Sequence, residues 1–221
     1  MTQRIPAPVF GRTKDGLLVA RAGESAFAFV PSRAGHYFAY GSGIDRPMSA
    51  WCRDDFYGHG GSLADEIAFR AAVHEQHRHQ LERGRLGRTA ETGVASTPWG
   101  MAQVTTIYGP GVRKHATVSH GGFEVDRDRN QHVHPALRTG GWYEEDCAWA
   151  AVALSFPELF TTYERHQAER TIRHFQPEAW EAIHGRPLQP GGSDERDRLS
   201  GRPAEPAPHD HPEEFWSVGA S

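Results

Sequence analysis

Residues 101–125 read MAQVTTIYGPGVRKHATVSHGGFEV, and this stretch shows the best organised pattern of strands and turns in the sequence. Two runs of strand length, 101–108 and 112–119, flank Gly109-Pro110-Gly111, which has the length and composition of a turn. Residues 123–125 then return as a third run. The pattern predicts a three-stranded antiparallel meander, and hence an α+β protein with small antiparallel sheets packed against helices.

His120 ends the second predicted strand, and Gly121 and Gly122 follow it directly. Because glycine has no side chain, the pair leaves room beside the imidazole, as a site approached by a ligand requires. A tight turn explains the same residues without any role for the histidine. Both interpretations stay open at the level of the sequence.

A loop over residues 126–141, rich in Arg and Asp, leads into a predicted helix over residues 142–156. Glu144, Glu145 and Asp146 fall in its first turn, where acids offset the positive end of the helix macrodipole. Beyond that turn the helix is apolar nearly all round, which predicts that it is buried.

Cys147 lies one turn into this predicted helix, where the dipole lowers the pKa of a thiol that solvent reaches. With His120 and Glu145 it would complete a catalytic set of nucleophile, base and orienting acid. Free cysteine is also among the most buried residue types, so packing alone explains it. A further alternative pairs His120 with Glu144 or Glu145 in general acid–base chemistry or substrate binding.

The remainder of the predicted core domain, residues 93–185, is helical. Thr161 and Glu164 form a capping box for a helix that runs to about Phe175, and a short helix ends at Gly185. Residues 186–221 are charged and rich in Pro and Gly, which predicts a disordered tail. Within that tail the acidic and aromatic sequence EEFWSV is a candidate docking patch.

Residues 1–92 predict a small β region followed by a polar helix. Short apolar runs predict three strands, at residues 17–21, 26–30 and 36–40. Residues 54–61 are expected to form a loop, after which Ser62 caps the helix.

One stripe of that helix carries apolar residues at helical spacing and ends at His74; its other members are Leu63, Ile67 and Ala71. Beyond Val73 the helix is too polar to bury a face and is expected to fray into a linker ending near Gly93. The same stretch holds His74, His77 and His79 among arginines. Metal or phosphate binding is one interpretation of this group, and a solvated helix end is the favoured one.

Composition excludes several classes of protein. A net charge of −4 and a pI near 6.4 give no overall basic field for nucleic acid. No run reaches the ~18 apolar residues of a membrane span, and the N-terminus lacks a signal-peptide core. Cys52 and Cys147 build neither a disulfide framework nor a zinc motif, and His132-x-His134 is a weak metal signal. We therefore expect a cytoplasmic protein with reduced thiols and no cofactor.

The succession STPWGxAQ, SHGG, RN and GWYEEDCxW resembles an uncharacterised domain family found in phage- and plasmid-encoded bacterial proteins. The resemblance covers about residues 96–184 and implies an accessory role on a mobile element, in conjugation or in countering host defence. The residues that carry it are Trp99, Gln103, His120, Gly121, Gly122, Trp142, Tyr143, Glu144, Glu145, Asp146 and Cys147. Arg129, in the RN pair, is a further candidate binding residue.

Two hypotheses follow from these residues. The first is a module that binds a protein of the host or of the mobile element through Trp99, Trp142, Tyr143 and the acids, since aromatic anchors dominate such surfaces. The second is a hydrolase or transferase that uses His120 with Glu145 or Cys147. The first is slightly favoured, because no nucleophile motif or cofactor loop is recognisable.

Overall fold

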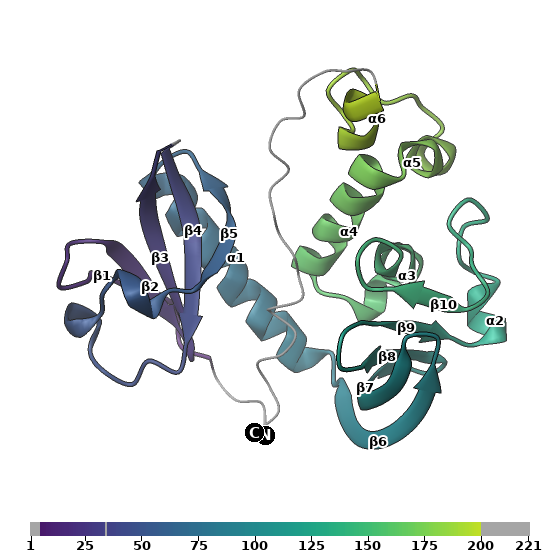
Figure 1. Cartoon of the computed structure of the whole chain (residues 1–221), viewed down its shortest axis with the longest axis horizontal. Helices are drawn as coiled ribbons and strands as arrows, with labels where there is room; N and C mark the ends of the chain where they lie inside the picture. The colour runs from purple at the N-terminus through teal and green to yellow at the C-terminus, as the bar shows by residue number, and fades with distance from the viewer. Residues whose placement is uncertain (1–4, 34, 200–221) are drawn as a thin grey trace. The chain divides into compact units, whose positions relative to one another are not determined.

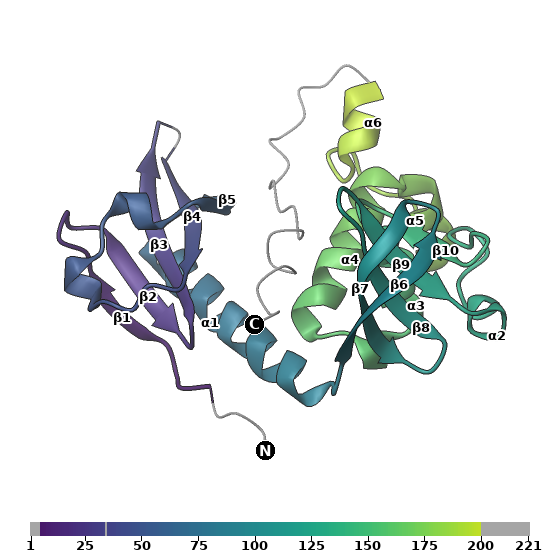
Figure 2. The same ribbon diagram turned by 60° about the horizontal axis from the view of Figure 1, so that its bottom comes forward.

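A computed structural model describes residues 5–33 and 35–199 of the chain (Figure 1). The described chain divides into two compact units, with the boundary between Leu81 and Glu82. Each unit contains one five-stranded antiparallel sheet, and Figure 2 shows both sheets with their helices. The expected α+β class with small antiparallel sheets is confirmed.

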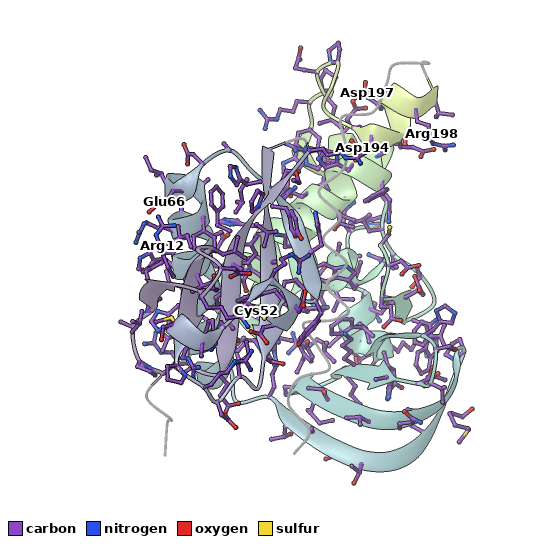
Figure 3. The ribbon with its side chains drawn as sticks, turned by 60° about the vertical axis from the view of Figure 1, so that its left-hand side comes forward. Arg12, Cys52, Glu66, Asp194, Asp197 and Arg198 are labelled. Atoms are coloured by element: carbon purple, nitrogen blue, oxygen red, sulfur yellow. The ribbon has the colours of Figure 1, made fainter. Side chains whose placement is uncertain are left out.

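The first sheet follows the order of the chain, β1-β2-β3-β4-β5. Its strands are Val9–Arg12, Leu18–Ala22, Ser25–Ser32, Gly35–Ser42 and Gly58–Leu63. The three strands predicted from the sequence are thus confirmed as β2, β3 and β4. Two short 3-10 helices, Met48–Ala50 and Arg53–Asp55, follow β4, and α1 spans Glu66–Arg85. Cys52 and Glu66 mark these segments in Figure 3.

Both faces of this sheet are buried. Phe69 and Val73 of α1 cover one face, while Trp51 and Phe56 from the segment between β4 and β5 cover the other. A strand covered on both sides needs apolar residues at successive positions rather than at alternate ones. This requirement explains the unbroken apolar run in β3.

Residues 58–63 form a strand, so the predicted loop over residues 54–61 is wrong in its second half. Glycine suits this strand because neighbouring rings need the space. A Cβ on Gly58 would lie 2.0 Å from the Tyr40 ring, and one on Gly60 would lie 2.8 Å from the Phe38 ring. Ser62 lies in the strand and caps nothing; the Asp65 carboxylate instead accepts the amide of Ala68 at 2.8 Å.

The predicted stripe of α1 is also wrong, since Ile67 is 78% exposed. The buried side of the helix carries Phe69, Val73, Gln76 and His79. Polar residues therefore continue the buried face beyond Val73, and the helix does not fray there. Residues 89–97 then form a strand, so the predicted linker, which ends near Gly93, is wrong where it overlaps the first half of that strand.

The second sheet has the order β10-β9-β8-β7-β6. Its strands, in chain order from β6 to β10, are Thr89–Thr97, Gly100–Gly109, Val112–Ala116, Gly121–Val125 and Trp142–Glu144. The predicted hairpin and meander are confirmed as β7, β8 and β9. A short helix, α2, spans Arg127–Asn130 after β9.

The predicted helix over residues 142–156 is wrong in its first half. Residues 142–144 form β10, and the helix α3 spans only Trp149–Ser155. Tyr143 pairs with Phe123 of β9 and is fully buried in the core against the helices. Pairing and burial of this tyrosine outweigh the local signals of a helix start.

The later helices agree with the sequence. The Thr161–Glu164 capping box begins α4, Thr162–Phe175, after a 3-10 turn at Pro157–Leu159, and Gly185 ends α5, Pro177–His184. The residues predicted to form a disordered tail lie mostly outside the described part. Within it, Asp194–Leu199 form the short helix α6, which the composition does not predict (Figure 3).

A buried ion pair joins the start of β6 to α4. The Arg88 guanidinium donates to both oxygens of Glu164, at 2.8 and 2.6 Å, and to the carbonyl of Leu159 at 2.7 Å. The exposed fractions of the two paired side chains are 9% and 2%. Burial, the largest single influence, lowers the pKa of Arg88, but the hydrogen bonds that Arg88 donates to Glu164, together with the nearby Tyr108 and Glu164, outweigh burial and raise this pKa.

Replacing Glu164 with Gln is expected to destabilise the second unit by about 3–5 kcal/mol, because it leaves the Arg88 charge buried without a counter-charge. Urea denaturation followed by tryptophan fluorescence measures the change. Glu158→Gln is the matched control, since Glu158 is 60% exposed and its pair with Arg129 is long, at 3.4 Å. Equal stability of the two variants would contradict a structural role for the buried pair.

Candidate functional site

One end of the second sheet gathers most of the candidate residues. The turn between β6 and β7 (97–100) and the turn between β8 and β9 (117–120) lie at this end, because antiparallel pairing places the start of β7 beside the end of β8. The end of β10 joins them, since Glu144 pairs with Gly122 at the start of β9. Two turns and a strand end thus form one polar surface.

His120 occupies the bend that the sequence predicts. Thr117 closes the turn, since its amide and its hydroxyl both donate to the carbonyl of His120, at 2.8 and 2.6 Å. The amide of His120 in turn donates to the Thr117 hydroxyl at 3.2 Å. The backbone is therefore held while the imidazole stays exposed to solvent.

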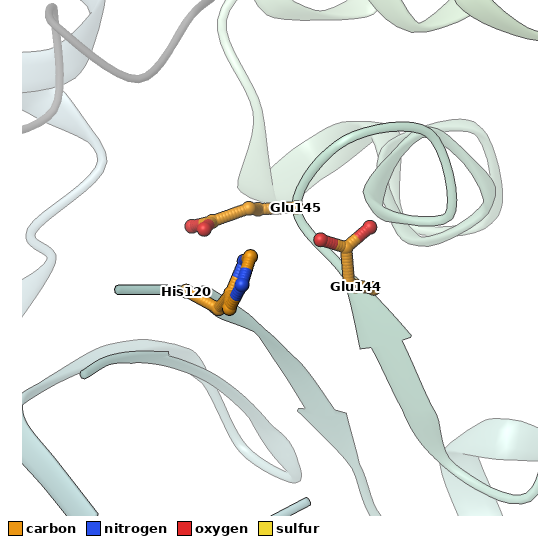
Figure 4. Close-up of side chains that lie close together, drawn as sticks. All are labelled: His120, Glu144 and Glu145. Carbon is orange, nitrogen blue, oxygen red and sulfur yellow. The ribbon is translucent and has the colours of Figure 1, made fainter. Parts of the chain in front are cut away.

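Glu144 and Glu145 approach the imidazole from the end of β10. The amide of Glu145 donates to the carbonyl of Gly121 at 3.1 Å, which fixes this residue beside His120. His120, Glu144 and Glu145 each offer one possible ligand atom, and these three atoms lie within 4.8 Å of one another. Both carboxylates are partly exposed. Figure 4 shows the three side chains converging from the β8–β9 turn and the strand end.

Gly121 and Gly122 make room for neighbouring groups. A Cβ on Gly121 would lie 2.5 Å from the Glu145 carboxylate, and one on Gly122 would lie 2.4 Å from the Trp99 ring. The space that we expected beside the imidazole therefore holds a carboxylate and an indole. The Glu145 carboxylate matters chemically, because it places an acid beside the imidazole of His120.

The aromatic candidates divide between surface and core. Trp99 and Trp142 are half-buried and pack edge to face, with ring centroids 5.8 Å apart. Tyr143 is fully buried and donates its hydroxyl to Asn130 at 2.5 Å, so its predicted place in a contact surface is wrong. Gln103 is exposed near the start of β7.

Arg129 belongs to another part of the second unit. Its guanidinium donates to the carbonyl of Pro110, at the turn between β7 and β8, and pairs with Glu158. That turn lies at the opposite end of the sheet from His120. The structure therefore does not bring Arg129 to the candidate site.

Cys147 lies in the turn between β10 and α3, so it is not inside a helix as predicted. Burial, followed by the charges of Asp146 and Glu144, raises the pKa of its thiol. The predicted lowering of this pKa by a helix dipole is wrong. At neutral pH the residue is a thiol rather than a thiolate, which disfavours it as a nucleophile.

A buried polar network that was not expected from the sequence lies on the sheet face that carries Trp142. His115 is 2% exposed, and its ring nitrogens lie 2.9 Å from the Thr105 hydroxyl and 3.2 Å from the Glu124 carboxylate. The ring also lies 5.8 Å from that of Trp142. Strand alternation puts His115 on the same face as Arg113 and Thr117, but no local signal in the sequence shows that Trp142 lies against it.

The other histidine groups do not assemble into metal sites in residues 5–33 and 35–199. His79 is buried within α1, and His132 and His134 contact the backbone of their own loop. Over this part of the chain, the cluster of His120, Glu144 and Glu145 is the group whose donor atoms come within reach of one ion. The sequence marks these three residues as candidates but assigns them no metal.

Comparison with family models places residues 92–204 in a family described as Domain of unknown function (DUF7007), and the chain belongs to it. The match contains the whole candidate site and most of the second unit. Neither the curated proteins nor the solved structures contain a match to the chain. Among the described residues, no helix has both the length and the apolar character that crossing a membrane requires.

Replacing Gly122 with Ala is expected to cost about 1–3 kcal/mol in unfolding free energy, since the new methyl group overlaps the Trp99 ring and the carbonyl of Tyr143. Gly140→Ala is the matched control, because a Cβ at that position would have nothing within 4 Å. Urea denaturation compares the two variants. If the Gly122→Ala variant proved as stable as the Gly140→Ala variant, the close contact between position 122 and the Trp99 ring would be refuted.

Cys147 is expected to react with iodoacetamide at neutral pH more slowly than free cysteine, because its pKa is raised. Asp146→Asn should speed the reaction by removing a negative charge, while Asp128→Asn on α2 serves as the control. A Cys52→Ser background leaves Cys147 as the reporting thiol, and mass spectrometry follows the labelling. Faster labelling of Cys147 than of free cysteine would instead indicate an activated nucleophile.

Proposed function

We propose that the second unit is a hydrolase that depends on a divalent metal ion held by His120, Glu144 and Glu145. The observation that carries this proposal is the approach of one imidazole and two carboxylates to within 4.8 Å at a solvent-reached surface. Imidazole and carboxylate together suit Zn²⁺ or Mn²⁺. Ligands of such an ion lie about 3–4 Å apart, so small side-chain rotations complete the site.

The arrangement around the cluster supports a catalytic site more than a structural one. Three protein ligands leave positions on the ion for water and substrate, whereas structural zinc sites are closed by four. One oxygen of Glu144 accepts the amide of Asp146 at 3.0 Å, which orients that carboxylate. The hydrogen-bonded turn at Thr117 restrains His120 in the same way.

Hydrolysis through a bound ion is favoured over the covalent alternative, in which Cys147 attacks the substrate. The raised pKa of Cys147 disfavours the thiolate that such a transferase or hydrolase uses as its nucleophile. His120 with Glu145 acting without metal is the remaining enzymatic alternative. The metal titration below separates it from the proposal.

A second candidate function is the macromolecule-binding module. Two exposed apolar side chains at the same end of the sheet favour it: Val118, in the β8–β9 turn, is 84% exposed, and Met101, near the start of β7, is 52% exposed. A cytoplasmic accessory role on a phage or plasmid is the setting that the family resemblance implies. Occurrence of the gene within mobile elements would test that setting.

The test of the metal site is calorimetric titration of the full chain with Zn²⁺ and with Mn²⁺. We expect binding of a single ion, and we expect His120→Ala, Glu144→Gln and Glu145→Gln each to weaken it more than about tenfold. The matched controls are His166→Ala and Glu91→Gln, which change exposed side chains elsewhere in the same unit. Equal affinity in the cluster variants and the controls would refute the proposal.

A further inference from the structure

We propose that the site acts on an extended polypeptide that binds along the open edge of β10, an inference that rests on the proposed metal site. Three features of the same end of the sheet support it. They are the free backbone of an edge strand, the charge around the cluster, and the apolar side chains beside it.

β10 is the terminal strand of its sheet, with β9 as its neighbour on one side. The amide of Glu145 bonds to Gly121, and the amide of Val125 bonds to Gly141. Because antiparallel hydrogen bonds alternate along a strand, the backbone groups of Glu144 point away from β9. An edge strand with such groups pairs readily with an added strand.

The first half of that edge is already occupied. The Thr139 hydroxyl donates to the carbonyl of Trp142 at 2.8 Å, which blocks this position for an added strand. The backbone of Glu144 is left for pairing, and Glu144 itself supplies a ligand to the cluster. A peptide paired there would run directly past the proposed metal ion.

Charge argues against a phosphate ester as the substrate. Residues 96–103, 115–122 and 142–147, which form this end of the sheet, contain neither Lys nor Arg. Lys114 pairs with Phe123 on the face that the helices cover. Arg113, on the other face, is paired with Glu124 at 3.3 Å, so its charge is already matched. Phosphoryl-transfer sites clamp their substrate with arginine or lysine as well as metal, so a neutral amide fits this surface better.

Exposed apolar side chains at this end of the sheet indicate which substrate residues the site prefers. Val118 and Met101 are exposed at this end of the sheet, where the half-buried rings of Trp99 and Trp142 pack against each other. Such a surface favours an apolar residue next to the scissile peptide bond. In the reaction, the oxygen of water bonds to the carbonyl carbon and the C–N bond breaks. One proton of the water passes to the leaving nitrogen, and the other stays with the new carboxyl group.

The test uses the full chain loaded with Zn²⁺ or Mn²⁺ and two probes. β-Casein provides an unfolded polypeptide, and bis(p-nitrophenyl) phosphate provides a phosphodiester. We expect casein to be cleaved beside apolar residues, as read by mass spectrometry, and the phosphodiester to remain intact. Val118→Lys should lower kcat/KM for casein about tenfold, with metal affinity unchanged. Val9→Lys, a change at an exposed residue of the first unit, should leave cleavage unaltered.

The outcomes separate the two proposals. Metal binding with hydrolysis of the phosphodiester alone would overturn the polypeptide assignment and keep the metal-dependent hydrolase. Metal binding with neither probe cleaved would also overturn the polypeptide assignment. If the wild-type chain bound neither Zn²⁺ nor Mn²⁺, the proposed function would be refuted, and the inference about its substrate with it.

Discussion

The pairing of β10 with β9 is the constraint on which the candidate site depends. It buries Tyr143 against Phe123 and sets Glu144 opposite Gly122, so two acids arrive beside His120. A shift of one residue would turn the tyrosine out of the core and the acids away from the histidine. The core therefore fixes the register, and the register assembles the cluster.

A buried charge supports the same sheet from its other edge. Arg88 at the start of β6 binds Glu164, whose carboxylate also accepts the amide of Thr161 in the capping box of α4. The carboxylate thus satisfies a helix end and a buried guanidinium at once. The Arg88–Glu164 pair thus joins β6 to α4, and Tyr143 packs β10 against the helices. Both edges of the sheet are therefore fixed, and the exposed end between them can hold a functional site in place.

The sequence predicts those parts of the fold that local chemistry determines. The Gly109–Gly111 turn and the Thr161 cap are examples, because their signals lie within a few residues of the structure that they form. The sequence does not predict β5 and β10, because contacts between distant parts of the chain determine these strands. The rings of Tyr40 and Phe38 in β4 fit only against glycines of β5, and Tyr143 of β10 pairs with Phe123 of β9. His120, Glu144 and Glu145 were identified as candidates by residue type. Their meeting depends on strand pairing, which no spacing along the chain reveals.

The proposed function requires that His120, Glu144 and Glu145 hold one divalent ion. Anomalous diffraction at the zinc edge from crystals of the full chain grown with Zn²⁺ tests it most directly. We expect a peak about 2.0–2.2 Å from one imidazole nitrogen and one oxygen of each carboxylate. A map with no peak at this end of the second sheet, or with zinc bound only at other histidines, would contradict it.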